Sequence, residues 1–165
     1  MSTALASQIP LLVYHQITTL FDLHPFNGVR NDRPAERWAE AGVNGILMSL
    51  APIGFAFRIS GLMKFGVVYY FVLFAVEIVI WWIPYLIVPK GIWRRAYNGA
   101  LAVATSNFES GDTLTHWEAI YRRIYAGTIS FLPERSGRVR PNLEHTLLHV
   151  ATLTTALLTL KAVYP

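Results

Sequence analysis

Cysteine is absent from the 165-residue chain, which excludes disulfides, cysteine-ligated zinc, iron–sulfur clusters and thiol catalysis. Charged residues are also scarce: they make up 15% of the chain, against about 25% in a typical soluble domain. The sequence contains no glycine-rich phosphate loop, no serine nucleophile elbow and no HExxH zinc motif. These absences leave no signature of a soluble enzyme class, and whether the protein is an enzyme stays open.

Hydrophobic residues, in contrast, make up 53% of the chain, and the longest apolar run covers residues 65–88. No Lys or Arg occurs between Lys64 and Lys90. A helix over this run is about 36 Å long, enough to cross a hydrocarbon core of about 30 Å with some tilt. The run therefore predicts a transmembrane helix. Trp81, Trp82 and Tyr85 beside Pro84 indicate an aromatic belt and a kink near its end.

Three further segments have the length and composition of membrane spans. The four predicted spans cover residues 4–23, 41–57, 65–88 and 143–163. The connection 89–141 is long and polar, and it contains a segment with an apolar face that includes Trp117 and Tyr121. We therefore predict an all-α polytopic membrane protein, a single bundle over residues 1–165 with four transmembrane helices and one amphipathic interfacial helix. In the alternative, residues 4–23 lie in the membrane interface instead of crossing it.

The basic residues are distributed unequally between the two predicted sides of the membrane. With four spans, the connections 24–40 and 89–141 hold eleven of the fourteen Lys and Arg residues, and only Arg58, Lys64 and Lys161 lie on the other side. By the positive-inside tendency, both connections are cytoplasmic and both termini lie outside the plasma (inner) membrane. The net charge of +4 is then attributed to contact with anionic membrane lipids, and no nucleic acid partner is expected.

Several ionisable residues fall inside the predicted spans, where they are costly and often functional. Glu77 and His15 are candidates for a buried acid–base pair or proton relay. His15 and His149 are candidates for the two axial ligands of a haem b. His145 and His149, at a spacing of four on one helix face, could bind zinc, iron or manganese together with Asp22 or Glu77. In the fourth interpretation, these side chains only form hydrogen bonds between helices.

Five arginines in the third connection are candidates for binding anionic lipid headgroups. They are Arg122, Arg123, Arg135, Arg138 and Arg140.

Two functions remain open on the sequence alone. The first is a small integral membrane protein that binds lipid or another hydrophobic molecule, or serves as a subunit of a homo-oligomer or a larger membrane complex. The second is a membrane enzyme or redox protein that uses the buried Glu and His residues. The sequence identifies no cofactor.

Overall fold

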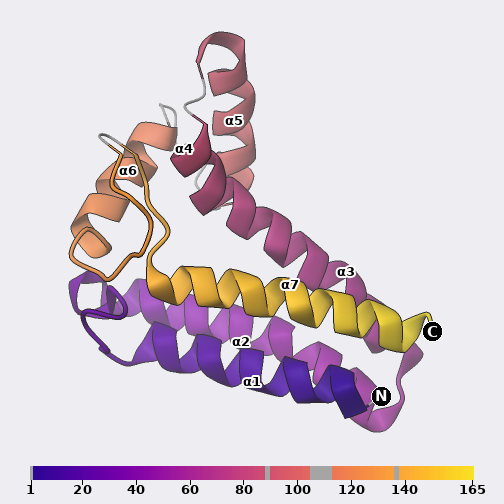
Figure 1. Cartoon of the computed structure of the whole chain (residues 1–165). Helices are drawn as coiled ribbons and strands as arrows, with labels where there is room; N and C mark the ends of the chain where they lie inside the picture. Colours follow the sequence, from indigo (N-terminus) through magenta and orange to yellow (C-terminus); the bar gives the residue numbers. More distant parts are fainter. Residues whose placement is uncertain (1, 88–89, 105–112, 136–137) are drawn as a thin grey trace.

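The computed structural model describes residues 2–87, 90–104, 113–135 and 138–165, and the described residues form helices and connecting loops without a strand. The helices are α1 (Ser2–Leu20), η1 (Val29–Asn31), α2 (Pro34–Phe57), α3 (Ser60–Glu77), the π-helical turn η2 (Ile78–Trp82), α4 (Ile83–Leu86), α5 (Gly91–Ala104), α6 (Thr113–Ile124) and α7 (Leu143–Val163). Figure 1 shows α1, α2 and α7 side by side, with α3 running at an angle to them and α5 and α6 near its far end.

The four long segments form a bundle in which α1 packs on α2 and α7, and α3 packs on the same two helices. Its apolar centre consists of Leu11, Met48, Ala51, Tyr70 and Ala156, all buried. Large apolar side chains also cover the outside of the bundle, as they do on a protein surrounded by lipid. Examples are Ile9, Ile46, Val68, Val72, Val150 and Leu157.

Among the described residues, three helices are long and apolar enough to cross a membrane, which indicates a membrane location for the protein. They are Pro34–Phe57, Ser60–Leu86 and Leu143–Val163. Helix α7 covers the same residues as the last predicted span, whereas α2 starts seven residues and α3 five residues before the spans predicted there. Val88, the predicted end of the third span, lies outside the described residues, as do 89, 105–112 and 136–137 of the long connection.

Proline explains the π-helical turn near the end of the third long segment. Pro84 has no backbone N–H, so the carbonyl groups one turn earlier lose their helical donor. The Trp117 indole donates to the Ile80 carbonyl oxygen at 2.9 Å, and the Tyr97 hydroxyl donates to that of Val79 at 2.8 Å. Side chains of α5 and α6 thus satisfy the carbonyl groups that the turn leaves free.

The aromatic residues around this turn face the protein. Trp81 is 4% exposed, and its ring centroid lies 3.9 Å from that of His145. Tyr85 is buried as well. The prediction of an aromatic belt at the lipid surface is therefore wrong for these two residues. Residues of α6 and the start of α7 cover Trp81, and the loop with Pro133 and Arg135 covers Tyr85.

The described part of the long connection contains two helices, and one of them was not predicted. Helix α5 packs with α6 on the π-helical turn through the buried residues Tyr97, Leu101 and Leu114. The apolar face predicted for α6 exists, but Trp117 and Tyr121 on it contact Trp81. Much of this face is therefore covered by the protein itself.

Candidate functional site

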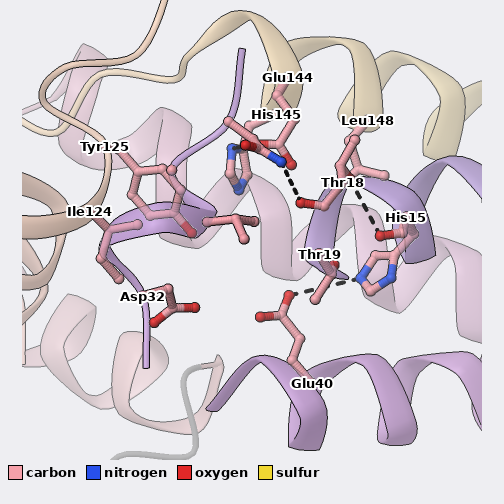
Figure 2. Close-up of a pocket in the computed structure, with 13 residues that line it drawn as sticks. His15, Thr18, Thr19, Asp32, Glu40, Ile124, Tyr125, Glu144, His145 and Leu148 are labelled. Carbon is pink, nitrogen blue, oxygen red and sulfur yellow. Dashed lines mark hydrogen bonds and ion pairs between the residues drawn. The ribbon is translucent and has the colours of Figure 1, made fainter. Parts of the chain in front are cut away.

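A small cavity lies at the end of the bundle where α1 ends and where α2 and α7 begin (Figure 2). Its volume is about 40 Å³, room for about three water molecules. The polar groups around it come from separate elements. They are His15, Thr18, Thr19, Asn27, Asp32, Glu40, Tyr125, Glu144 and His145. We call this space the end cavity.

Two histidine–carboxylate contacts define the chemistry of the end cavity. His15 Nε2 lies 3.8 Å from Glu40 Oε1, and His145 Nδ1 lies 3.3 Å from Glu144 Oε2. The His15 side chain is 7% exposed, whereas that of Glu40 is 52% exposed. The end cavity therefore has a buried interior and reaches the protein surface at Glu40.

Two groups on the loop side of the cavity have shifted pKa values. Burial raises the pKa of the Tyr125 hydroxyl well above its usual range, and the nearby carboxylates of Glu40 and Glu144 raise it further. Burial also raises the pKa of Asp32, although the Arg33 backbone N–H donates to this carboxylate. Both shifts favour the neutral form, so the end cavity disfavours additional negative charge.

We expect Asp32→Asn to change how stability depends on pH. Because the folded-state pKa of Asp32 is raised, its contribution to stability is fully present below the unfolded value of about 3.9 and is lost as the pH rises through the folded-state value. The asparagine variant should therefore be more stable than the wild type at neutral pH and lose this advantage in acid. Thermal unfolding of both proteins across pH tests this, and parallel pH profiles would contradict it.

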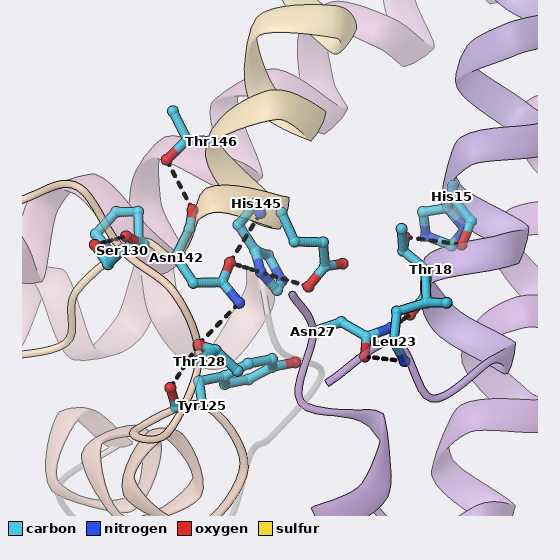
Figure 3. Close-up of polar contacts among 12 residues, drawn as sticks. His15, Thr18, Leu23, Asn27, Tyr125, Thr128, Ser130, Asn142, His145 and Thr146 are labelled. Carbon is cyan, nitrogen blue, oxygen red and sulfur yellow. Dashed lines mark hydrogen bonds and ion pairs between the residues drawn. The ribbon is translucent and has the colours of Figure 1, made fainter. Parts of the chain in front are cut away.

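Buried asparagines shape the loops around the end cavity (Figure 3). Asn27 donates to the carbonyl oxygens of Thr18 and Phe21 at 2.8 Å each, which satisfies carbonyl groups at the end of α1. Asn142 precedes α7, and its Oδ1 accepts from the His145 backbone N–H at 2.9 Å. These bonds fix the helix ends that carry the polar groups of the cavity.

A second set of polar side chains lies deeper in the bundle. The Thr152 hydroxyl lies 2.8 Å from Glu77 Oε1, and the Trp82 indole donates to His149 Nδ1 at 2.9 Å. Glu77 is 6% and His149 2% exposed. Glu77 Oε2 and His149 Nε2 are buried without a hydrogen-bond partner in the described part of the chain.

The structure brings together only some of the residues that were predicted to form an acid–base pair, a haem site or a metal site. Glu77 bonds to Thr152, whereas His15 contacts Asn44, at 3.3 Å, and Glu40, so no hydrogen bond joins Glu77 to His15. His149 and His15 likewise have different partners. The rings of His145 and His149 do lie near each other, with centroids 6.0 Å apart.

The predicted metal ligands are not gathered into one cluster. Asp22 is exposed and pairs with Arg30 at 3.2 Å, and the His24 backbone N–H and this arginine lower its pKa. Among the described residues, no group of three or more His, Asp or Glu side chains is arranged to hold a metal ion.

Four of the five predicted headgroup arginines line one pocket of about 240 Å³ beside α6. They are Arg122, Arg135, Arg138 and Arg140, and we call this space the arginine pocket. Glu118 and Glu134 also line it, which leaves a net charge of +2. Arg123 does not line this pocket and pairs with Glu36 at 3.6 Å.

Sequence reasoning missed several residues of the end cavity, namely Glu40, Asp32, Tyr125 and Glu144. A usable signal existed, because Glu40 and Glu144 stand at the starts of two predicted spans on the same side of the membrane. Helix ends on one side of a bundle meet, so acids there can share a site with His145.

No family model matches the chain, and no curated protein or solved structure matches it significantly. The function is therefore inferred from the geometry of the molecule alone.

Proposed function

We propose that this chain is an integral membrane protein that binds lipids with an anionic headgroup in the arginine pocket. The observation that carries the proposal is the gathering of Arg122, Arg135, Arg138 and Arg140 around one pocket at the end of the longest apolar helix. Arginine forks recognise phosphate groups by paired hydrogen bonds, and basic pockets near helix ends attract lipid headgroups.

The arginines of the pocket divide into two kinds. Arg138 Nη1 donates to the Tyr85 and Leu86 carbonyl oxygens, at 2.9 and 3.3 Å, and so satisfies the end of α4. Arg140 donates to the Leu132 carbonyl oxygen at 3.3 Å. Arg122 and Arg135 are exposed, and Arg135 lies over the Tyr85 ring at 4.9 Å. Arg122 and Arg135 are therefore available to bind a headgroup, while Arg138 and Arg140 stabilise the walls of the pocket.

The proposed arrangement in the membrane has four crossing helices, with α1 as the fourth. Helix α1 has 19 residues, about 28 Å, and packs along α2 and α7. It buries Gln8, His15 and Thr18 and exposes Ile9 and Val13, the distribution that a crossing helix needs.

In this arrangement the arginine pocket, the end cavity and α6 lie at the cytoplasmic surface of the plasma (inner) membrane, with both termini outside. The unequal distribution of basic residues supports this orientation. Association into a homo-oligomer or with other membrane subunits is compatible with the small size of the bundle and stays a proposal.

The test is the affinity for phosphatidylglycerol, measured by native mass spectrometry of the protein in mild detergent. The double variant Arg122→Gln/Arg135→Gln should bind this lipid about 30-fold more weakly, since each arginine near a headgroup contributes about 1 kcal/mol. Binding of neutral phosphatidylcholine should not change. Substitution of Arg138 or Arg140 is avoided, because both donate to backbone carbonyl groups.

The matched control is Lys64→Gln/Lys161→Gln, which removes the same charge at the other end of the bundle. Its affinity should stay within about twofold of the wild type, because charges beyond a Debye length are screened. Equal losses in both double variants would contradict a specific pocket. Displacement of the lipid by inorganic phosphate would assign the pocket to free phosphate instead.

A second candidate function is a membrane enzyme or redox protein that uses the buried Glu and His groups. The histidine–carboxylate contacts of the end cavity favour it. An optical spectrum and elemental analysis of the purified protein test it. A Soret band would indicate haem b and make His15 and His149 the first residues to substitute. Stoichiometric zinc, iron or manganese without that band would favour a site at His145. Absence of all of them would leave proton transfer as the chemistry of these groups.

A further inference from the structure

The geometry around Glu77 accommodates both protonation states of its carboxyl group. The Thr152 hydroxyl has one hydrogen but lies 2.8 Å from Glu77 Oε1 and 2.9 Å from the Leu148 carbonyl oxygen. When Glu77 is ionised, Thr152 can donate to it. When Glu77 is protonated, its O–H can donate to Thr152, which then donates to Leu148. A proton can therefore be added or removed without moving either side chain.

The partner of His149 fixes which nitrogen of its ring carries the hydrogen. The Trp82 indole N–H can only donate, so His149 Nδ1 accepts it and the neutral ring carries its hydrogen on Nε2. This buried N–H and the buried Glu77 Oε2 have no partner among the described residues. A buried donor and a buried acceptor without partners lower the stability of the folded bundle. Such groups mark places where a proton or a water molecule is exchanged.

A route leads from these groups to the end cavity. His149 and His145 lie one turn apart on α7, with ring centroids 6.0 Å apart. His145 lines the end cavity, which has room for about three water molecules and reaches the surface at Glu40. His145 Nδ1 lies 2.7 Å from Asn142 Oδ1, an acceptor, so the ring donates there and its Nε2 is free to accept a proton.

The ionisable groups that face Glu77 are few. On its own helix, the Tyr69 hydroxyl interacts with its charge. From α7, Thr152 bonds to the carboxyl group, and the nearest ionisable residue along that face is His149, one turn before Thr152. Helix α2 has no charged residue between Glu40 and Arg58, and α1 has only Tyr14 and His15 as ionisable side chains. Within the described ranges no cation stands beside Glu77 to keep it ionised, so a proton is its available counter-charge.

We propose that Glu77 is a reversible proton-binding site inside the bundle, and that it exchanges its proton with the end cavity through His149. In the uptake step, His149 Nε2–H passes its proton to a water molecule between the two unpaired groups, and this water passes one of its own hydrogens to the Glu77 carboxylate, while His149 Nδ1 takes a proton from a hydronium ion supplied by the end cavity. Two O–H bonds and one N–H bond form, one N–H bond and two O–H bonds break, and a water molecule is left in the end cavity. The Trp82 N–H loses its acceptor, so Trp82 restrains the exchange by occupying the nitrogen that must be protonated.

The experiment is infrared spectroscopy of the protein in lipid nanodiscs. The C=O stretch of a protonated carboxylic acid should rise as the pH is lowered, and Glu77→Gln should lack this component. After transfer to heavy water, the component should shift as the carboxyl proton exchanges. In His149→Gln, which keeps an acceptor for the Trp82 N–H, this exchange should be about tenfold slower. In Trp82→Phe it should be faster than in the wild type.

Opposite effects of these two variants separate a relay from a merely structural role, because loss of packing would speed exchange in both. An unchanged exchange rate in His149→Gln would overturn the route through this residue. Identical spectra of the wild type and Glu77→Gln across the pH range would overturn the proton site itself. If His149→Gln fails to fold, His149→Phe takes its place in the same comparison. None of these outcomes depends on lipid binding in the arginine pocket.

Discussion

Gly66→Leu is expected to destabilise the bundle strongly, lowering the midpoint of thermal unfolding by about 6–12 °C. A Cβ atom on Gly66 would stand 2.6 Å from the Cβ of Ala51 and 3.7 Å from the Thr159 methyl group. Both neighbours are fully buried, so neither helix can move aside without opening the centre of the bundle. Overpacking of this kind costs about 3 kcal/mol, and about 2–4 °C are lost per kcal/mol at this chain length.

The chain offers a matched control in the same helix. Gly61 also belongs to α3, but a Cβ atom there would meet nothing within 4 Å. Gly61→Leu should therefore leave the unfolding midpoint unchanged or raise it slightly, since leucine favours helix more than glycine does. Circular dichroism in mild detergent measures both variants. If Gly61→Leu loses as much as Gly66→Leu, the close approach of α2 and α3 is not the cause.

The same contact shows how far the sequence could predict the packing. Ala51 was a predictable interface residue, because small side chains let helices in lipid approach closely. Its partner Gly66 could not be identified, since helix order and rotation depend on contacts between residues far apart in sequence. The existence of the long helices could be predicted from the length of the apolar runs alone. The bounds of α7 could be predicted from Asn142 before the helix and from the polar residues at its end.

The polar sites were predictable to different degrees. Glu77 and His149 could be selected because ionisable residues inside an apolar run need an explanation. The group of five arginines could be selected from the density of basic residues in one connection, but the pocket that four of them line could not. Only part of the end cavity could be assembled from the sequence: Glu40 and Glu144 stand at helix starts on one side, but no pattern places Asp32 and Tyr125 of the loops beside them.

The π-helical turn was beyond prediction too. Pro84 indicates that carbonyl groups one turn earlier lack their helical donor, but it does not indicate which side chains replace that donor. The replacements, Trp117 and Tyr97, belong to helices of the long connection, and only the folded chain brings them to the turn.

Asn142→Ala is expected to lower the unfolding midpoint by about 5–10 °C, because one side chain makes several buried hydrogen bonds. Asn142 is 1% exposed. Its Oδ1 caps α7 through the His145 backbone N–H at 2.9 Å, and its Nδ2 donates to the Thr128 hydroxyl at 3.2 Å. Loss of the cap costs about 1 kcal/mol, and each buried group left without a partner adds about 1 kcal/mol or more.

Two further variants separate these contributions. Asn142→Ser keeps an acceptor for the cap, adds no charge at this buried position and loses the donor to Thr128, so it should be more stable than Asn142→Ala. Thr128→Val removes the same bond from the other side, together with the bond that the Thr128 hydroxyl donates to the Tyr125 carbonyl oxygen at 2.6 Å, and should leave the cap intact. If Asn142→Ser is as unstable as Asn142→Ala, the cap contributes nothing and this account fails. Because the capped residue His145 also lines the end cavity, the stability of this helix start and the geometry of the proposed proton route depend on the same side chain.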